Sequence, residues 1–182
     1  MSTFDEAWAR TIGLEGGYSD NANDAGGPTQ FGITQVVARA NGYTGPMKDL
    51  TLATAKAIAK SAYWDLYNMD AIAFHAPLLA QLMFDISYNG GYPGKWLQRA
   101  LNAMSRPAPL IVDGVIGGLS VAVLGNFMSL RGKDAEIVLM RLLYCQRGVY
   151  FLELAEASGP DATFIYGWAD GRLGPLPQST TT

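Results

Sequence analysis

Residues 15–34 read EGGYSDNANDAGGPTQFGIT, and they interrupt a chain that is otherwise patterned for helices. The stretch is rich in Gly, Asn, Asp and Pro, and from Tyr18 onward its apolar anchors are Phe31 and Ile33. Residues of these types favour turns over regular helix or long strand. From Tyr18 to Thr34 the stretch therefore predicts a loop or a small irregular hairpin.

The segment before this stretch predicts a first helix over residues 3–14. Phe4, Trp8 and Ile12 are four residues apart, which places them on one face of a helix. Gly16 and Gly17 follow, and glycine is the residue type that ends helices in the left-handed region. Glu15 is thus expected at the C-terminal end of this helix.

Downstream, apolar residues at helical spacing recur between capping and breaking residues. Strand signals are scarce and no internal repeat is evident, so the predicted fold is mainly α. The predicted helices cover residues 34–41, 51–64, 77–89, 93–104, 119–130, 133–157 and 161–168.

The composition excludes several classes of protein. The 182 residues are 49% hydrophobic and 16% charged, which is typical of a globular protein of one domain or two small modules. The net charge is −3 and there is no basic tract, so nucleic-acid binding is not expected. One Cys and one His exclude a disulfide framework and are too few for a structural zinc site, and no metal or cofactor is expected.

The chain also lacks the pattern of a membrane protein. Charged residues interrupt the apolar positions of residues 1–16, so no signal peptide is expected. The stretches 71–81 and 110–130 are nearly uncharged, but proline, aspartate or glycines break them. We expect a soluble protein without stable membrane insertion, made and kept in a cytoplasm.

Three residues around the glycine-rich stretch are candidates for chemistry: Glu15, Asp24 and Thr29. Two carboxylates beside a cleft are what glycoside hydrolysis requires, one to protonate the leaving oxygen and one to support water or the developing cation. The C-terminal end of a helix carries partial negative charge and disfavours an ionised carboxylate. Glu15 is therefore expected to have a raised pKa, which suits a general acid. The alternative interpretation is a solvated helix-end glutamate and an aspartate that forms a turn.

The same residues resemble a known family. The run 15–34 is similar to the E-G-G-Y … D-x-G-G-x-T-x-x-G-I-T signature of the glycoside hydrolase family 108 endolysins, N-acetylmuramidases of phages and prophages. The resemblance continues through residues 40–43, 63–65 and 84–90. Residues 96–102 and 112–117 then resemble the predicted peptidoglycan-binding region that follows in this family, and residues 164–168 resemble its last helix.

The resemblance implies a lysozyme-like catalytic region at 1–92 and a helical peptidoglycan-binding region at 93–174, followed by a tail at 175–182. No linker rich in Pro or Ser divides the two regions, so we expect them to pack as one compact domain. The resemblance also implies a monomeric phage endolysin that hydrolyses the β-1,4 bond between N-acetylmuramic acid and N-acetylglucosamine. Glu15 matches the family's catalytic acid, and Asp24 with Thr29 is similar to the pair that holds the attacking water in phage lysozymes. Asp20 is the alternative second carboxylate.

Two other functions stay open at this point. A lytic transglycosylase cuts the same bond with one acid and no base, and a non-catalytic cell-wall-binding or virion protein keeps the fold without turnover. An endolysin without a signal peptide would remain in the host cytoplasm until a phage-made membrane lesion released it to the wall.

Aromatic and amide side chains near the glycine breaks are candidates for a sugar-binding groove, because aromatic faces stack on pyranose rings. Packing is the competing explanation for each of them. The candidates are Tyr18, Phe31, Tyr88, Asn89 and Tyr92.

The remaining conspicuous residues are expected to be structural. A peptidase pair of His75 and Cys145 is disfavoured because nothing orders either residue for it, and Cys145 is expected to be a small buried residue. The four tryptophans lie on apolar helical faces and are expected in the core: Trp8, Trp64, Trp96 and Trp168.

Overall fold

The structure is a computed structural model that describes residues 3–12, 17–20, 27–105, 110–157 and 165–173. The chain divides into two compact units, residues 1–88 and residues 89–182. The predicted packing of the two regions as one compact domain stays a prediction.

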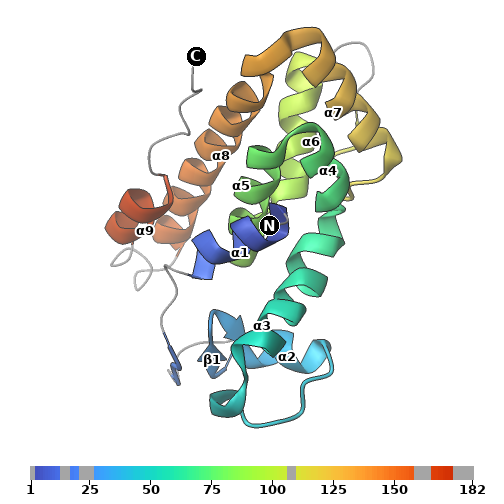
Figure 1. The fold of residues 1–182 in the computed structure, drawn as a ribbon. Coiled ribbons are helices and arrows are strands. Elements are labelled where there is room, and N and C mark those ends of the chain that lie inside the picture. Colours follow the sequence, from blue (N-terminus) through green and yellow to red (C-terminus); the bar gives the residue numbers. More distant parts are fainter. Residues whose placement is uncertain (1–2, 13–16, 21–26, 106–109, 158–164, 174–182) are drawn as a thin grey trace. The chain divides into compact units, whose positions relative to one another are not determined.

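The first unit is built from helices and one very short hairpin (Figure 1). The hairpin and α2 lie at one end of α3, and α4 follows at the other end. Its elements are α1 (Thr3–Ile12), β1 (Thr29–Gln30), β2 (Ile33–Thr34), α2 (Gln35–Ala40), η1 (Met47–Asp49), α3 (Leu52–Ala59), the π-helical turn η2 (Lys60–Trp64), η3 (Asp65–Tyr67), α4 (Met69–His75) and α5 (Pro77–Tyr88).

Local sequence signals set the ends of these helices. The Thr34 side chain accepts a hydrogen bond from the Val37 backbone N–H at 3.4 Å, and the Thr51 side chain accepts one from Thr54 at 3.2 Å. Both are N-caps, which satisfy backbone donors that a helix start leaves free. Pro77 begins α5, as predicted. The predicted hairpin and the predicted helices of this unit are confirmed.

An aromatic cluster forms the core of the first unit. The ring of Phe4 in α1 contacts those of Trp64 and Phe84 edge to face, with centroids 5.4 and 5.6 Å apart. Trp8 contacts Tyr88 at 6.1 Å in the same geometry. Edge-to-face packing of this kind stabilises a core beyond the burial of apolar area. The cluster therefore fixes α1 against α5.

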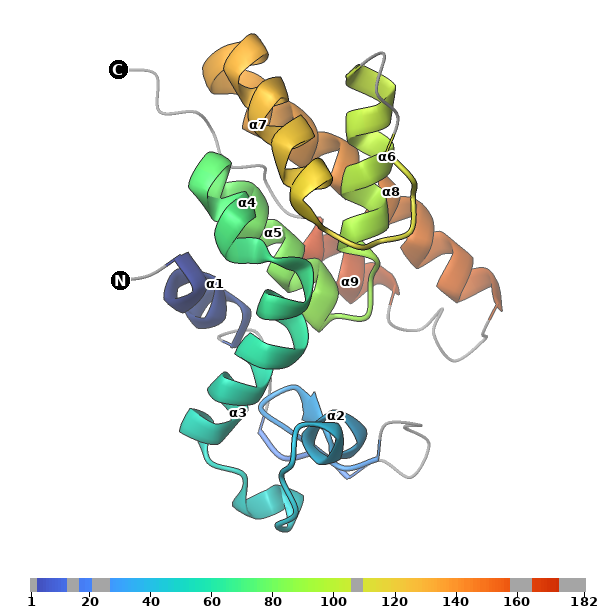
Figure 2. The same ribbon diagram turned by 90° about the vertical axis from the view of Figure 1, so that its right-hand side faces the viewer.

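The described part of the second unit consists of the α-helices α6, α7, α8 and α9 and the short 3-10 helix η4 (Figure 2). Helix α8 contacts α6, α7 and α9. The predicted helix over residues 93–104 is confirmed at both ends. The elements are α6 (Pro93–Met104), α7 (Gly118–Arg131), η4 (Gly132–Asp134), α8 (Ala135–Ala157) and α9 (Ile165–Arg172).

Two amides on α6 fix the loop that precedes α7. Gln98 is 2% exposed, and its side chain donates to Asp113 Oδ1 at 2.8 Å and accepts from the Gly114 N–H at 2.8 Å. One turn later the Asn102 side chain donates to the Leu110 carbonyl at 2.7 Å and also accepts from the Leu110 N–H. The resemblance motifs at 96–102 and 112–117 therefore meet in space as a helix and the loop bound to it.

Some expectations are wrong in detail. Helix α4 was not predicted, and Cys145, expected to be buried, is exposed. The buried positions of α8 include Leu139, Leu143 and Arg147, which are four residues apart, so a residue two positions after Leu143 lies on the opposite side of the helix.

The expectation of core tryptophans holds for Trp8, Trp64 and Trp96, whereas Trp168 is half-buried against Phe151. In the described part of the chain, no helix is both long and apolar enough to cross a membrane.

Candidate active site

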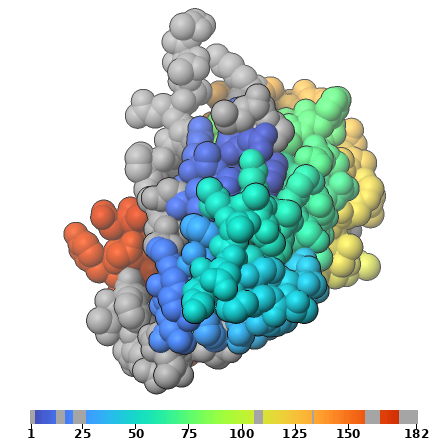
Figure 3. Space-filling model, turned by 60° about the horizontal axis from the view of Figure 1, so that its bottom comes forward, coloured from blue at the N-terminus to red at the C-terminus, as the bar shows by residue number. Residues whose placement is uncertain are grey.

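The hairpin β1–β2 is the centre of the predicted catalytic region. Thr29 pairs with Thr34 and Gln30 with Ile33, which leaves Phe31 and Gly32 as a two-residue turn. Both turn residues have positive φ angles, 52° at Phe31 and 74° at Gly32. This is the backbone geometry of the tight turns that match the twist of a hairpin. Together with α2 and α3, the hairpin forms one face of the first unit (Figure 3).

Tyr88, at the end of α5, holds the tip of this hairpin. Its hydroxyl donates a hydrogen bond to the Phe31 carbonyl. A Cβ added to Gly32 would lie 2.6 Å from the Cε1 atom of the Tyr88 ring, so the glycine permits the contact. Tyr88 is 7% exposed, and the Tyr63 ring packs on it at 5.0 Å. The tyrosine thus positions the hairpin, and its predicted contact with a sugar stays a prediction.

A third segment of chain pairs with the hairpin on the other side of β1. Ser19 and Thr29 exchange both backbone hydrogen bonds, at 2.9 and 2.8 Å. Tyr18 and Asp20 are the chain neighbours of Ser19, so each lies one residue from the position that pairs with Thr29. The predicted site residues Tyr18 and Thr29 and the alternative carboxylate Asp20 are therefore brought together by backbone pairing.

Tyr18 and Asp20 interact at this edge. The Tyr18 hydroxyl donates to Asp20 Oδ2 at 3.3 Å, and Tyr18 is 48% exposed. Partial desolvation and the nearby Asp20 carboxylate raise the pKa of Tyr18 above its ordinary value. The phenol therefore stays protonated at neutral pH and presents an accessible ring face beside a carboxylate.

The Thr29 hydroxyl has one partner among the described residues. Its Oγ1 donates to the Gly27 carbonyl at 3.3 Å. A hydroxyl whose proton is used in this way keeps lone pairs that accept a hydrogen bond from water. Such an oxygen orients a water by accepting a hydrogen bond from it, which is the role that the resemblance implies for Thr29.

Two of the predicted catalytic residues, Glu15 and Asp24, lie outside the described residues. The described elements nearest to them in the sequence are α1, which is described as far as Ile12, the bridge at Ser19 and the hairpin. Their catalytic roles, and that of Thr29, stay predictions.

The remaining predicted sugar-binding residues lie in different settings. Phe31 is half-buried at the turn of the hairpin, whereas Asn89 is half-buried and Tyr92 is 51% exposed in the second unit. Tyr92 caps α6, and its carbonyl accepts from the Trp96 N–H at 3.0 Å. Among the described residues, no group of His, Cys, Asp and Glu is arranged to hold a metal ion.

Comparison with known proteins identifies both halves of the chain. Residues 8–91 match the family model "Glycosyl hydrolase 108", and residues 92–173 match the "Predicted Peptidoglycan domain". The chain joins a glycosyl hydrolase 108 region to a peptidoglycan domain. It is a glycoside hydrolase that degrades peptidoglycan. The resemblance seen in the sequence is confirmed in both regions.

A solved structure supports the fold of the chain. SagA from Brucella abortus matches it with a TM-score of 0.71 and 24% identity, over 94% of this chain and 89% of that one. The mainly α, lysozyme-like fold is thereby confirmed. No curated protein matches the chain.

The boundary between the two family matches falls close to the boundary between the structural units. The glycosyl hydrolase 108 region ends at residue 91 and the first unit ends at residue 88. All of the predicted site residues except Tyr92 lie within the glycosyl hydrolase 108 region. Tyr92 is the first residue of the peptidoglycan domain.

Proposed function

We propose that the enzyme is an N-acetylmuramidase that hydrolyses the β-1,4 bond between N-acetylmuramic acid and N-acetylglucosamine. The observation that carries the proposal is the signature run of residues 15–34, which lies within the match to glycosyl hydrolase 108 and contains the hairpin. In this proposal Glu15 protonates the leaving oxygen. Asp24, with Thr29, orients and activates the attacking water.

The arrangement of the hairpin supports this division of roles. Thr29 is fixed by two backbone bonds to Ser19 and by the pairing with Thr34, so its hydroxyl has a defined position. A positioned acceptor lowers the entropic cost of placing a water for attack. Removal of the hydroxyl in Thr29→Val is expected to reduce the rate about 10- to 100-fold, which is less than the roughly 10²- to 10⁴-fold typical for loss of an acid or base, because Thr29 orients the water and transfers no proton. Thr29→Ser, which keeps the oxygen, is expected to retain most of the activity.

The decisive experiment is the clearing of purified cell walls by Glu15→Gln. The amide cannot donate a proton as an acid does, so clearing is expected to fall by at least about 100-fold while the circular dichroism spectrum is unchanged. Glu156→Gln, an exposed position at the end of α8, is the matched control and is expected to clear walls normally. Normal clearing by Glu15→Gln would end the proposal.

The second carboxylate is tested with Asp24→Asn and Asp20→Asn. Loss of activity in the first variant alone supports Asp24, and loss in the second alone assigns the role to Asp20. Mass spectrometry of the products tests the reaction type. Reducing ends with added water support hydrolysis, anhydromuramic ends support a lytic transglycosylase, and wall binding without products supports a non-catalytic protein.

We extend the proposal to the biological setting: a monomeric phage endolysin that leaves the host cytoplasm through a membrane lesion. The similarity of the 15–34 run to phage and prophage endolysins supports it. Expression in a bacterial cytoplasm should lyse cells only when a membrane-permeabilising protein is produced as well. Lysis without that protein would contradict the proposed route, and light scattering of the purified protein tests the monomer.

A further inference from the structure

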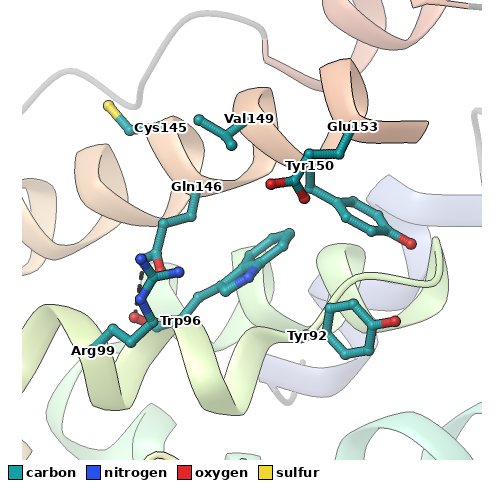
Figure 4. Close-up of a pocket in the computed structure, with 8 residues that line it drawn as sticks. All are labelled: Tyr92, Trp96, Arg99, Cys145, Gln146, Val149, Tyr150 and Glu153. Carbon is teal, nitrogen blue, oxygen red and sulfur yellow. Dashed lines mark hydrogen bonds between the residues drawn. The ribbon is translucent and has the colours of Figure 1, made fainter. Parts of the chain in front are cut away.

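The peptidoglycan domain contains a groove between α6 and α8 that the sequence did not reveal. Its volume is about 420 Å³, which is within the range of about 300–1,000 Å³ for small-molecule sites. Residues from both helices line it (Figure 4): Tyr92, Trp96 and Arg99 from the start and body of α6, and Gln146, Tyr150 and Glu153 from α8. All six lie within the region that matches the peptidoglycan domain.

The spacing of these residues explains how two helices build one groove. On α6 the three lining residues follow one another at intervals of four and three, and on α8 the same intervals recur. Side chains at such intervals lie on one face of a helix. Gln146 joins the two faces, because its Nε2 donates to the Trp96 carbonyl at 3.0 Å. The width of the groove is therefore fixed by a hydrogen bond between its walls.

Aromatic rings occupy one part of the groove. The Tyr150 ring meets Tyr92 and Trp96 with centroids 5.6 and 5.8 Å apart and interplanar angles of 75° and 63°. The three rings thus form a corner of steeply inclined faces, and the Tyr150 hydroxyl, bound to the Gly90 carbonyl at 3.2 Å, holds the central ring in place. Tyr92 is 51% exposed. The accessible Tyr92 ring, inclined to that of Tyr150, is suited to the apolar face of a pyranose, whereas the buried Trp96 supports the corner.

Two opposite charges flank these rings. Figure 4 shows Arg99 at one end, beside Gln146, and Glu153 at the other, beside Tyr150. Within the described part of the chain, neither charged group has a salt bridge or a hydrogen bond. An arginine in this setting recognises a carboxylate with two parallel hydrogen bonds. The groove thus combines an aromatic corner with a guanidinium that has no partner in the described chain.

We infer that this groove binds a muropeptide: an N-acetylated amino sugar against Tyr92 and Tyr150, with a carboxylate of its peptide stem on Arg99. The inference rests on the proposed function, because it takes peptidoglycan as the ligand. The ligand's chemistry fits the groove in both parts. A sugar with an acetamido group presents an apolar face and hydrogen-bonding edges, and the stem supplies the anion that an uncharged glycan lacks.

Cys145 provides a probe of the groove in the unaltered chain. It is the single cysteine of the sequence, it is exposed, and it lines the groove. The rate of its alkylation by iodoacetamide is measured with and without a disaccharide tetrapeptide of N-acetylglucosamine and N-acetylmuramic acid. This fragment has no muramic acid–glucosamine bond to cleave, so the measurement does not depend on catalysis. We expect alkylation to slow at least fivefold at saturation, and an unchanged rate would overturn the inference.

The peptide-free N-acetylglucosamine tetramer is the comparison ligand. If Arg99 binds the stem, the tetramer protects Cys145 more weakly than the muropeptide, and Arg99→Gln removes that difference. Equal protection by the two ligands would overturn the assignment of Arg99.

Tyr92→Ala tests the aromatic corner. We expect its Kd for the muropeptide to rise about three- to tenfold, as is typical for loss of one aromatic contact, and Tyr92→Phe to bind normally. Tyr166→Ala and Arg141→Gln, exposed positions outside the groove, are the matched controls for the two substitutions and are expected to bind as the parent does. Normal binding by Tyr92→Ala, or an equal loss in Tyr166→Ala, would contradict the inference.

These results separate the inference from the proposed function. If Glu15→Gln clears walls normally while Tyr92→Ala weakens muropeptide binding, the catalytic proposal fails and the groove stands. If Glu15→Gln is inactive while Tyr92→Ala and Arg99→Gln bind normally, the catalytic proposal stands and the groove fails.

Discussion

The hairpin of the first unit and the groove of the second place their side chains by different means. Thr29 and Tyr18 are positioned by backbone pairing around a turn with two positive φ angles. In the groove, Tyr92, Trp96 and Tyr150 are positioned by the regular spacing of two helices. A turn of this kind depends on one or two glycines, whereas a helical face tolerates single substitutions. The two regions should therefore respond differently to equivalent changes.

The largest expected effect is that of Gly32→Ala on the hairpin. Alanine at a φ of 74° is strained by about 1–2 kcal/mol, and its Cβ would lie 2.6 Å from the buried Tyr88 ring. Overpacking of this kind adds about 1–3 kcal/mol. We expect a loss of about 3 kcal/mol in the free energy of unfolding measured with denaturant, and reduced wall clearing because Thr29 loses its position.

Gly42→Ala is the control for Gly32→Ala. Gly42 has a similar φ of 84°, but nothing lies within 4 Å of an added Cβ. It should therefore lose only the strain of about 1–2 kcal/mol. Equal losses at the two glycines would show that the Tyr88 contact contributes nothing.

Gly94→Ala is the corresponding change in the second unit. An added Cβ would lie 2.1 Å from the Gly114 carbonyl oxygen, so the loop held by Gln98 must move. Overpacking of about 3 kcal/mol is partly offset by about 1 kcal/mol, because alanine favours a helix over glycine. We expect a net loss of about 2 kcal/mol by thermal unfolding, less than for Gly32→Ala. Gly118→Ala, which meets no atom within 4 Å, should not destabilise the protein, and a similar loss there would contradict the argument.

The fold of both units was largely predictable from local signals. Capping threonines, prolines at helix starts and glycine breaks act over a few residues, so Thr34, Thr51 and Pro77 mark helix ends in the sequence as they do in the structure. Helix α4 was not predicted, because it is short and follows Asn68 in the left-handed conformation. The π-helical turn at 60–64 also carries no local signal, and it depends on burial of Trp64, whose Nε1 donates to Asp70 at 2.8 Å.

The sites were predictable to a different extent. The hairpin residues are close in sequence, so a glycine-rich signature was enough to propose Thr29 and Phe31 as candidates, whose roles stay predictions. The groove joins residues about fifty positions apart in the sequence, and no pattern in the sequence states that α6 packs on α8. The spacing of Tyr92, Trp96 and Arg99 was the available signal, but an amphipathic helix in a core has the same spacing.

Tyr88→Phe is expected to reduce stability less than Gly32→Ala or Gly94→Ala. The substitution keeps the buried ring and removes the hydroxyl that donates to the Phe31 carbonyl. Loss of one such bond costs about 1 kcal/mol, which denaturant unfolding should detect. Tyr92→Phe is the control, because the described residues offer the Tyr92 hydroxyl no hydrogen-bond partner, and it should be neutral. If Tyr88→Phe were also neutral, the hydroxyl would not hold the hairpin.

The smallest expected effect is a dependence of stability on acid pH in the second unit. The hydrogen bond from Gln98, followed by that from the Val115 N–H, lowers the pKa of Asp113 below its ordinary value. The folded state therefore favours the ionised carboxylate. Its contribution is complete above the pKa of the unfolded chain, about 3.9, and is lost as the pH falls through the lower pKa of the folded state.

Melting temperatures at pH 7 and pH 3 test this dependence. The parent should lose slightly more stability between these values than Asp113→Asn, which cannot titrate at this position. Gln98→Ala should lie between them, because the bond from Val115 remains. If Asp113→Asn and the parent lost the same amount of stability, the hydrogen bonds of residue 113 with Gln98 and Val115 would stabilise the loop without a contribution from the charge of the carboxylate. The loop that precedes α7 would then be held by geometry without help from charge, as the hairpin of the first unit is.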